Sequence, residues 1–115
     1  MTADILSVTT LEGPDASRVL IVTGEIDRDT RRHLSDAAGK VIADGHHRLI
    51  LDLSGLSFCD SSGLSLLVDL HRETQTKSGW LRLVAASPVL CDMLRVTNLD
   101  RMFTVYDTVE AAAAT

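Results

Sequence analysis

The run LILDL at residues 49–53 constrains the fold of this chain more than any other segment. Its apolar side chains point to both faces of a short strand, as in the central strands of sheets that are covered on both sides. Apolar residues also recur at helical spacing before this strand, in residues 34–42, and after it, in residues 64–71. A buried strand between two amphipathic helices predicts an α/β fold.

The rest of the chain continues this alternation. Gly13 and Pro14 separate the first two apolar segments and predict a β-hairpin, while residues 54–59 are expected to form a loop. The predicted strands are residues 5–11, 19–22, 49–53, 81–85 and 102–106. Strands that alternate with helices imply one mixed, mainly parallel sheet with an antiparallel first strand and about four α-helices. We expect a single domain over residues 1–115.

Short polar residues and glycines predict where the four helices begin and end. The expected N-caps are Asp27, Asp60, Ser87 (with Pro88 in the first turn) and Asp107, which forms an acidic capping box with Glu110. The expected ends are Gly45, the Ser78-Gly79 break and Asn98.

Charge and length exclude several classes of protein. A chain of 115 residues with 45% hydrophobic residues has the usual size of one domain. Its net charge of −5 lacks the basic footprint of a nucleic-acid binder. No apolar run approaches the ~20 residues that span a bilayer, and the N-terminus has no signal-peptide pattern. We expect a cytosolic protein without nucleic-acid or membrane partners.

The two cysteines, Cys59 and Cys91, show no spacing typical of a metal site or a redox motif. Buried free thiols are the favoured interpretation, because cysteine is among the most buried residue types and the cytosol is reducing. A redox role for Cys59 is the alternative.

The segment most informative about function is residues 51–64, where a strand, a loop and a helix start follow one another. If Asp60 is the N-cap, Ser61, Ser62 and Gly63 occupy the first helical turn. Free N–H groups and the helix dipole stabilise an anion there, so a phosphate on Ser61 would be well placed. We interpret the glycine as leaving room for a phosphoryl group or a partner backbone. The alternative is that these residues merely cap a helix.

Three motifs in this chain resemble STAS domains of the anti-sigma-factor antagonist type, over about residues 5–110. They are TGEID at residues 23–27, DLS at 52–54 with FCDSSGL at 58–64, and ASP at 86–88 before a helix that ends in Asn98-Leu99. The second match follows the family's phosphorylation loop and is the most specific.

The resemblance implies a STAS-like fold and a binding protein that is not an enzyme and carries no cofactor. It implies that Ser61 is the phosphoacceptor. It further implies that the unphosphorylated form binds an anti-sigma factor that is also a serine kinase, which releases the sigma factor. That kinase, which binds the ATP, would phosphorylate the antagonist, and a PP2C-type phosphatase would reset it.

The expected partner-binding residues surround Ser61: Asp27, Asp60, Ser62, Gly63, Ser65 and Asp69. Ser65 and Asp69 depart from the family, where glycine or a small neutral residue is common on the outward side of this helix. Asp69 either touches the kinase or is solvated.

Other functions compete with this interpretation. Asp27 and Asp60 could together bind Mg²⁺, although two helix caps are favoured because Mg²⁺ normally borrows substrate phosphate oxygens. A serine hydrolase is disfavoured because Ser61 lacks the Gly-x-Ser-x-Gly elbow and no histidine fits a triad; His71 is instead expected in the core. The stronger competitor is a STAS interaction subunit of a membrane transport or signalling assembly that is never phosphorylated.

Overall fold

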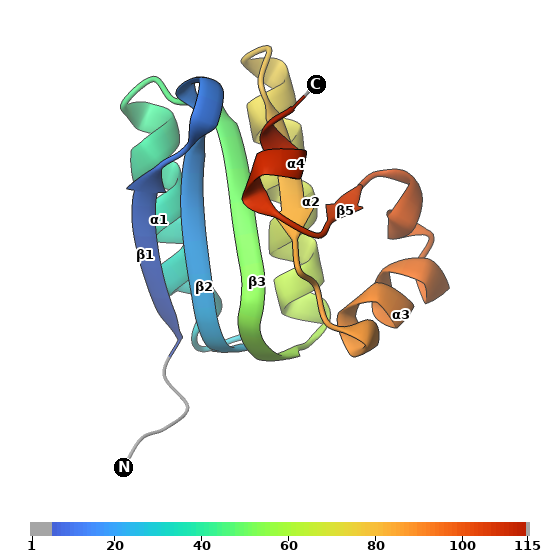
Figure 1. Ribbon diagram of the computed structural model, residues 1–115. Helices are drawn as coiled ribbons and strands as arrows, with labels where there is room; N and C mark the ends of the chain where they lie inside the picture. The colour runs from blue at the N-terminus through green and yellow to red at the C-terminus, as the bar shows by residue number, and fades with distance from the viewer. Residues whose placement is uncertain (1–5, 115) are drawn as a thin grey trace.

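The computed structural model describes residues 6–114 and contains one five-stranded sheet with the order β1-β2-β3-β4-β5 (Figure 1). β1 pairs with β2 in the antiparallel sense and the other pairs are parallel, which confirms the predicted topology. The elements are β1 (Ser7–Glu12), η1 (Pro14–Ala16), β2 (Arg18–Ile26), α1 (Arg31–Ala43), β3 (Arg48–Cys59), α2 (Ser61–Thr76), β4 (Trp80–Val84), α3 (Pro88–Val96), η2 (Leu99–Arg101), β5 (Val105–Tyr106) and α4 (Val109–Ala113). Ile5, in the first predicted strand, lies outside the described residues.

The sheet is covered on both faces, by α1 and α2 on one side and by α4 on the other (Figure 1). Leu49 and Leu51 of β3 are fully buried in the larger core with α1 and α2. Ile50 between them is fully buried in the smaller cluster under Ala112 and Ala113 of α4. β3 is therefore the two-sided central strand that the sequence predicts.

The predicted loop at residues 54–59 is wrong, because these residues continue β3 to Cys59. β2 and β3 stay paired through two register shifts, so that Thr23 lies opposite Gly55 and Glu25 opposite Phe58. A β-carbon on Gly55 would lie 2.9 Å from Thr23 Oγ1, so the close strand contact depends on glycine here. Register shifts of this kind interrupt the alternation of apolar and polar residues by which a strand is recognised in a sequence. The extension of β3 to Cys59 was therefore not predicted.

One predicted helix start, at Ser87, and two predicted helix ends, at Asn98 and Gly45, are confirmed. Ser87 Oγ accepts the Leu90 N–H at 3.2 Å at the start of α3, and Asn98 follows α3 with a left-handed φ of 62°. Gly45 follows α1 with φ 97°, and its N–H donates to Ile42 O at 3.0 Å. These left-handed residues satisfy carbonyl groups that the helix ends leave free.

Two predicted N-caps are wrong by one or a few residues. The N-cap of α1 is Thr30 rather than Asp27, which instead closes the turn before the helix. The N-cap of α4 is Thr108 rather than Asp107, and its hydroxyl accepts the Ala111 N–H at 3.1 Å. The last strand is shorter than predicted because the chain around Met102 belongs to the end of η2.

None of the helices within residues 6–114 is long and apolar enough to cross a membrane.

The connection between α2 and β4 is tight, with Ser78 at a left-handed φ of 62°. A β-carbon on Gly79 would collide with the carbonyl group of His47, at the start of the neighbouring strand.

We predict that Gly79→Ala destabilises the protein by about 2 kcal/mol or more, because the collision is with backbone that cannot move aside cheaply. Gly39→Ala is the matched control, since Gly39 lies inside α1 with no atom within 4 Å of an added β-carbon. That variant should gain up to about 1 kcal/mol from helix propensity. Urea titrations measure both, and equal stabilities would contradict the prediction.

Candidate functional site

The site is organised by the cap of α2, at the carboxyl edge of the sheet. Asp60 Oδ1 accepts the Ser62 N–H at 2.9 Å, the Gly63 N–H at 3.2 Å and the Ser62 hydroxyl at 2.6 Å. The Ser62 hydroxyl, together with these backbone donors, lowers the pKa of the Asp60 carboxyl below its usual value. Asp60 is thus an ionised cap, as the sequence predicts.

The two serines of the first turn differ in what their hydroxyl groups do. The Ser62 hydroxyl is held by Asp60 in the cap. Ser61 is exposed, and within residues 6–114 its hydroxyl has no hydrogen-bond partner. Of the two serines, Ser61 therefore presents the exposed hydroxyl at the helix N-terminus, whereas the Ser62 hydroxyl belongs to the cap.

Asp27 lies beside this cap in a turn of its own. Its Oδ1 accepts the Asp29 and Thr30 N–H groups at 2.9 Å and the Thr30 hydroxyl at 3.1 Å. The Thr30 N–H is the main cause that lowers the pKa of Asp27, and the nearby charge of Asp60 acts in the opposite direction. A hydrogen bond from Asp60 N to Ile26 O at 3.1 Å joins the two turns. The expectation that Asp27 and Asp60 lie close together is confirmed.

Gly63 has a different role from the one inferred from sequence. A β-carbon there would lie 2.6 Å from Cys59 Sγ and 2.8 Å from Ile26 Cγ2, so the missing side chain faces the core rather than a partner. The glycine lets the first turn of α2 pack directly on the ends of β2 and β3. We predicted that this glycine leaves room for a phosphoryl group or a partner backbone, and that explanation is wrong because the position faces the core.

Ser65 and Asp69 lie on the exposed side of α2, as expected. Asp69 forms an ion pair with Arg31 of α1 at 4.0 Å, and its side chain is 65% exposed. An exposed pair of this kind adds little stability. The carboxylate is therefore available on the same surface as Ser61.

The two cysteines are free, and they differ in burial. Cys59 is buried, and burial, with a smaller effect of the Asp60 charge, raises the pKa of its thiol to about 11. Because the thiolate is the reactive form, this environment disfavours a redox role for Cys59. Cys91 is only partly buried, so the prediction of a buried thiol is wrong for this residue.

Two groups bear on the alternative functions: the imidazole of His71 and the carboxylates of Asp27 and Asp60. His71 packs edge-to-face on Phe103 at 5.4 Å, and burial lowers the pKa of its imidazole, but the residue is only half-buried and lies at the margin of the core rather than inside it. In the part of the chain that the structure describes, no three His, Cys, Asp or Glu side chains are placed to share a metal ion. Asp60 caps α2, whereas Asp27 closes the turn before α1.

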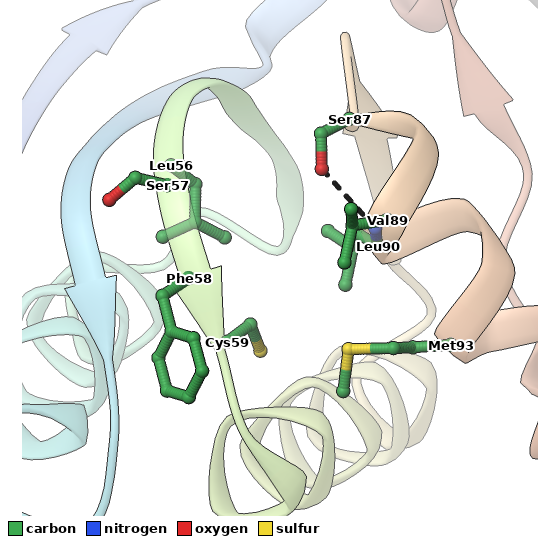
Figure 2. A pocket seen from close by; sticks show the side chains of 8 residues that line it. All are labelled: Leu56, Ser57, Phe58, Cys59, Ser87, Val89, Leu90 and Met93. Atoms are coloured by element: carbon green, nitrogen blue, oxygen red, sulfur yellow. Dashed lines mark hydrogen bonds between the residues drawn. The ribbon is translucent and has the colours of Figure 1, made fainter.

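Sequence reasoning missed an apolar hollow between α3 and the first turn of α2. Ser61, Leu64, Val89, Met93 and Val96 are among its lining residues. Figure 2 shows the adjoining pocket, where Cys59 of β3 points toward Met93 of α3. The signal was present in the sequence, because α3 carries more apolar residues than its buried side can hold.

The family model, the related sequences and the solved structures that match this chain all point to one family. The sequence model for the STAS domain matches residues 8–112. The anti-sigma-F factor antagonist RsfB of Mycobacterium tuberculosis is 34% identical over 94 residues, which cover 82% of this chain and 76% of that protein. The crystal structure of an anti-sigma factor antagonist from Mycobacterium paratuberculosis is 32% identical, with a TM-score of 0.85, over 96% of this chain and 93% of that one.

More distant structures share the fold. The anti-sigma factor antagonist SpoIIAA, solved in its unphosphorylated form, superposes with a TM-score of 0.77 at 23% identity, over 91% of this chain and 90% of its own. The phosphorylated form of the Bacillus protein gives 0.72 at the same identity, over 91% and 96%.

We predict that Gly63→Ala destabilises the protein by about 1–3 kcal/mol although alanine is the better helix former, because the added carbon meets Cys59 and Ile26. In a Cys59→Ala background, which removes the nearer of these atoms, the same change should cost clearly less. Denaturant titrations of the wild type, the two single variants and the double variant give the coupling free energy between residues 63 and 59. Additive effects would show that the contact with Cys59 is not the cause.

Proposed function

The chain belongs to the STAS domain family, in its anti-sigma factor antagonist group, and we propose that phosphorylation of Ser61 switches its binding off. The unphosphorylated form binds an anti-sigma factor that is also a serine kinase, and the sigma factor is released. The kinase transfers the γ-phosphoryl group of ATP to Ser61 Oγ, and ADP leaves. A PP2C-type phosphatase removes the phosphate. In this scheme the chain acts in the cytoplasm as a binding protein and supplies no catalytic group.

The observation that carries the proposal is the contrast between Ser61 and Ser62. A kinase needs an exposed hydroxyl that can turn toward the transferred phosphoryl group. Ser62 would have to break its 2.6 Å hydrogen bond to Asp60 and weaken the helix cap, whereas Ser61 is exposed at the same helix end. The positive end of the α2 dipole favours the product by about 0.3–1 kcal/mol.

The surroundings of Ser61 support partner binding on the same surface. Asp27, Asp60 and Ser65 lie around the start of α2, and Asp69 lies one turn beyond Ser65, with their polar groups reachable from solvent. Ser62 and Gly63 contribute through the cap, which fixes the backbone that a partner would meet. We propose this set as the contact surface for the anti-sigma factor.

Charge explains how a phosphate would end the complex. A phosphoserine adds about −1.5 to −2 charges beside the ionised Asp60. Two charges against one at roughly 6 Å and an effective dielectric near 20 give about 5 kcal/mol before screening. Water and salt remove most of this in the free protein, but a partner that excludes water restores it. We therefore propose that the interface fails while the domain keeps its fold.

We predict that Ser61→Ala abolishes phosphorylation by the cognate anti-sigma factor kinase and leaves stability within about 0.5 kcal/mol, because the hydroxyl is exposed. The matched variant Ser62→Ala should still be phosphorylated but lose about 1 kcal/mol through the cap bond. The mass of the intact protein after incubation with the kinase and ATP shows whether each variant has gained a phosphate. A wild type that binds the kinase and never gains a phosphate would instead favour a constitutive interaction subunit.

We predict that Asp27→Asn lowers affinity for the same kinase at least tenfold while the thermal midpoint changes little, since asparagine keeps the oxygen that accepts from Asp29 and Thr30. Asp52→Asn is the matched control. Its carboxylate likewise accepts the Ser54 N–H, at 3.0 Å, but in the middle of β3. Equal affinities for the two variants, measured by calorimetry, would reduce Asp27 to a turn-forming residue.

A further inference from the structure

α3 presents more apolar surface than the core uses. Leu90 and Leu94 are its buried residues. On the adjoining side of the helix Val89 is 69% exposed and Val96 is 83% exposed, and the half-buried Met93 lies between them. Positions i, i+4 and i+7 of a helix share one face. Val89, Met93 and Val96 therefore form a continuous apolar stripe, about two turns long.

This stripe forms one wall of a groove whose other wall is the first turn of α2. Leu64 lies in the groove together with Ser61, the serine proposed to be phosphorylated. The groove continues past Val89 and Met93 to Leu56 and the half-exposed Phe58 at the end of β3 (Figure 2). Contiguous apolar surface of this kind is typical of an interaction site, unlike single exposed side chains.

We propose that this groove, called here the α3 groove, is where an amphipathic helix of the anti-sigma factor docks, with apolar side chains on Val89, Met93 and Val96 and a basic side chain toward Asp60. The inference rests on the proposed function and adds to it the chemistry of the partner segment. About 10 Å separates residues seven apart in a helix, which matches two turns of a docked helix. Methionine at the centre suits such contacts because its side chain adapts to its neighbour.

Charge favours this occupant over a second copy of the chain. Each copy carries a net charge of −5, and the residue before the groove-lining Ser61 is the ionised Asp60, with Asp27 nearby. A second copy would bring the same carboxylates toward them. Asp92, also at the groove, is already paired with Arg95 of its own helix. A segment flanked by lysine or arginine is therefore the complementary partner.

The position of Ser61 on the groove wall connects docking with the switch. In the complex the Ser61 hydroxyl would lie at the edge of the apolar contact, where it can still reach the ATP of the kinase but is largely shielded from water. A phosphate on the same oxygen would have to lose its hydration there, which costs far more than burying a hydroxyl. The phosphorylated form would thus lose the apolar contact, because the cost of removing water from the phosphate exceeds what its attraction to a basic side chain returns.

The test is the double variant Val89→Ser/Val96→Ser, because both side chains are exposed and the fold should survive the change. Affinity is measured by calorimetry against the anti-sigma factors of the host genome, taken one by one. We expect a loss of at least 30-fold for the factor that binds the wild type. Leu11→Ser is the matched control, an exposed apolar residue on β1 at the opposite edge of the sheet, and it should bind within twofold of wild type.

The outcomes separate the two proposals. If no anti-sigma factor binds or phosphorylates the wild type, the proposed function fails, and the α3 groove inference with it. If the wild type binds and is phosphorylated on Ser61 but the double variant binds equally well, the groove inference alone is wrong. Loss of self-association in sedimentation velocity, with kinase affinity unchanged, would assign the groove to a second copy and also overturn it. Val96→Ser alone repeats the test if the double variant melts early.

Discussion

The carboxylate of Asp60 is the interaction on which the site depends. It fixes the first turn of α2 through two backbone N–H groups and ties up the hydroxyl of Ser62. It also places a negative charge beside Ser61, the exposed serine of this turn and the one that we propose is phosphorylated. One side chain thus defines the start of the helix, the choice between two adjacent serines and the electrostatic setting of any phosphate added there.

A second constraint is the close packing beneath that turn. Gly63 brings α2 onto Ile26 and Cys59, the last residues of β2 and β3. The same approach buries the Cys59 thiol and raises its pKa, so it stays protonated. The exposed face of the turn can therefore vary its polar groups without changing its position, because the buried face holds it.

Much of the fold could be predicted because apolar periodicity reports burial directly. The two-sided run around Ile50 identified the central strand, and the polar caps at Asp60 and Ser87 located two helix starts. The pattern failed where backbone pairing decides structure without a hydrophobic repeat, as in residues 54–59. It also misassigned Asp27, because an aspartate that closes a turn and one that caps a helix look the same in sequence. The exposed valines of α3 were missed because the surplus of apolar residues in this helix, although visible in the sequence, looks the same as a wider buried face.

The hydrogen bond from Asp60 N to Ile26 O lies at the far end of the β2–β3 ladder, between residues distant in the chain. Such a bond forms only after the loop that contains α1 has closed. The position of the start of α2 is therefore set by tertiary folding rather than by local helix formation. The start of α2 therefore takes up its position only once β2 and β3 have paired. Hydrogen exchange of the Asp60 amide reports how often this last rung of the ladder opens in the folded protein.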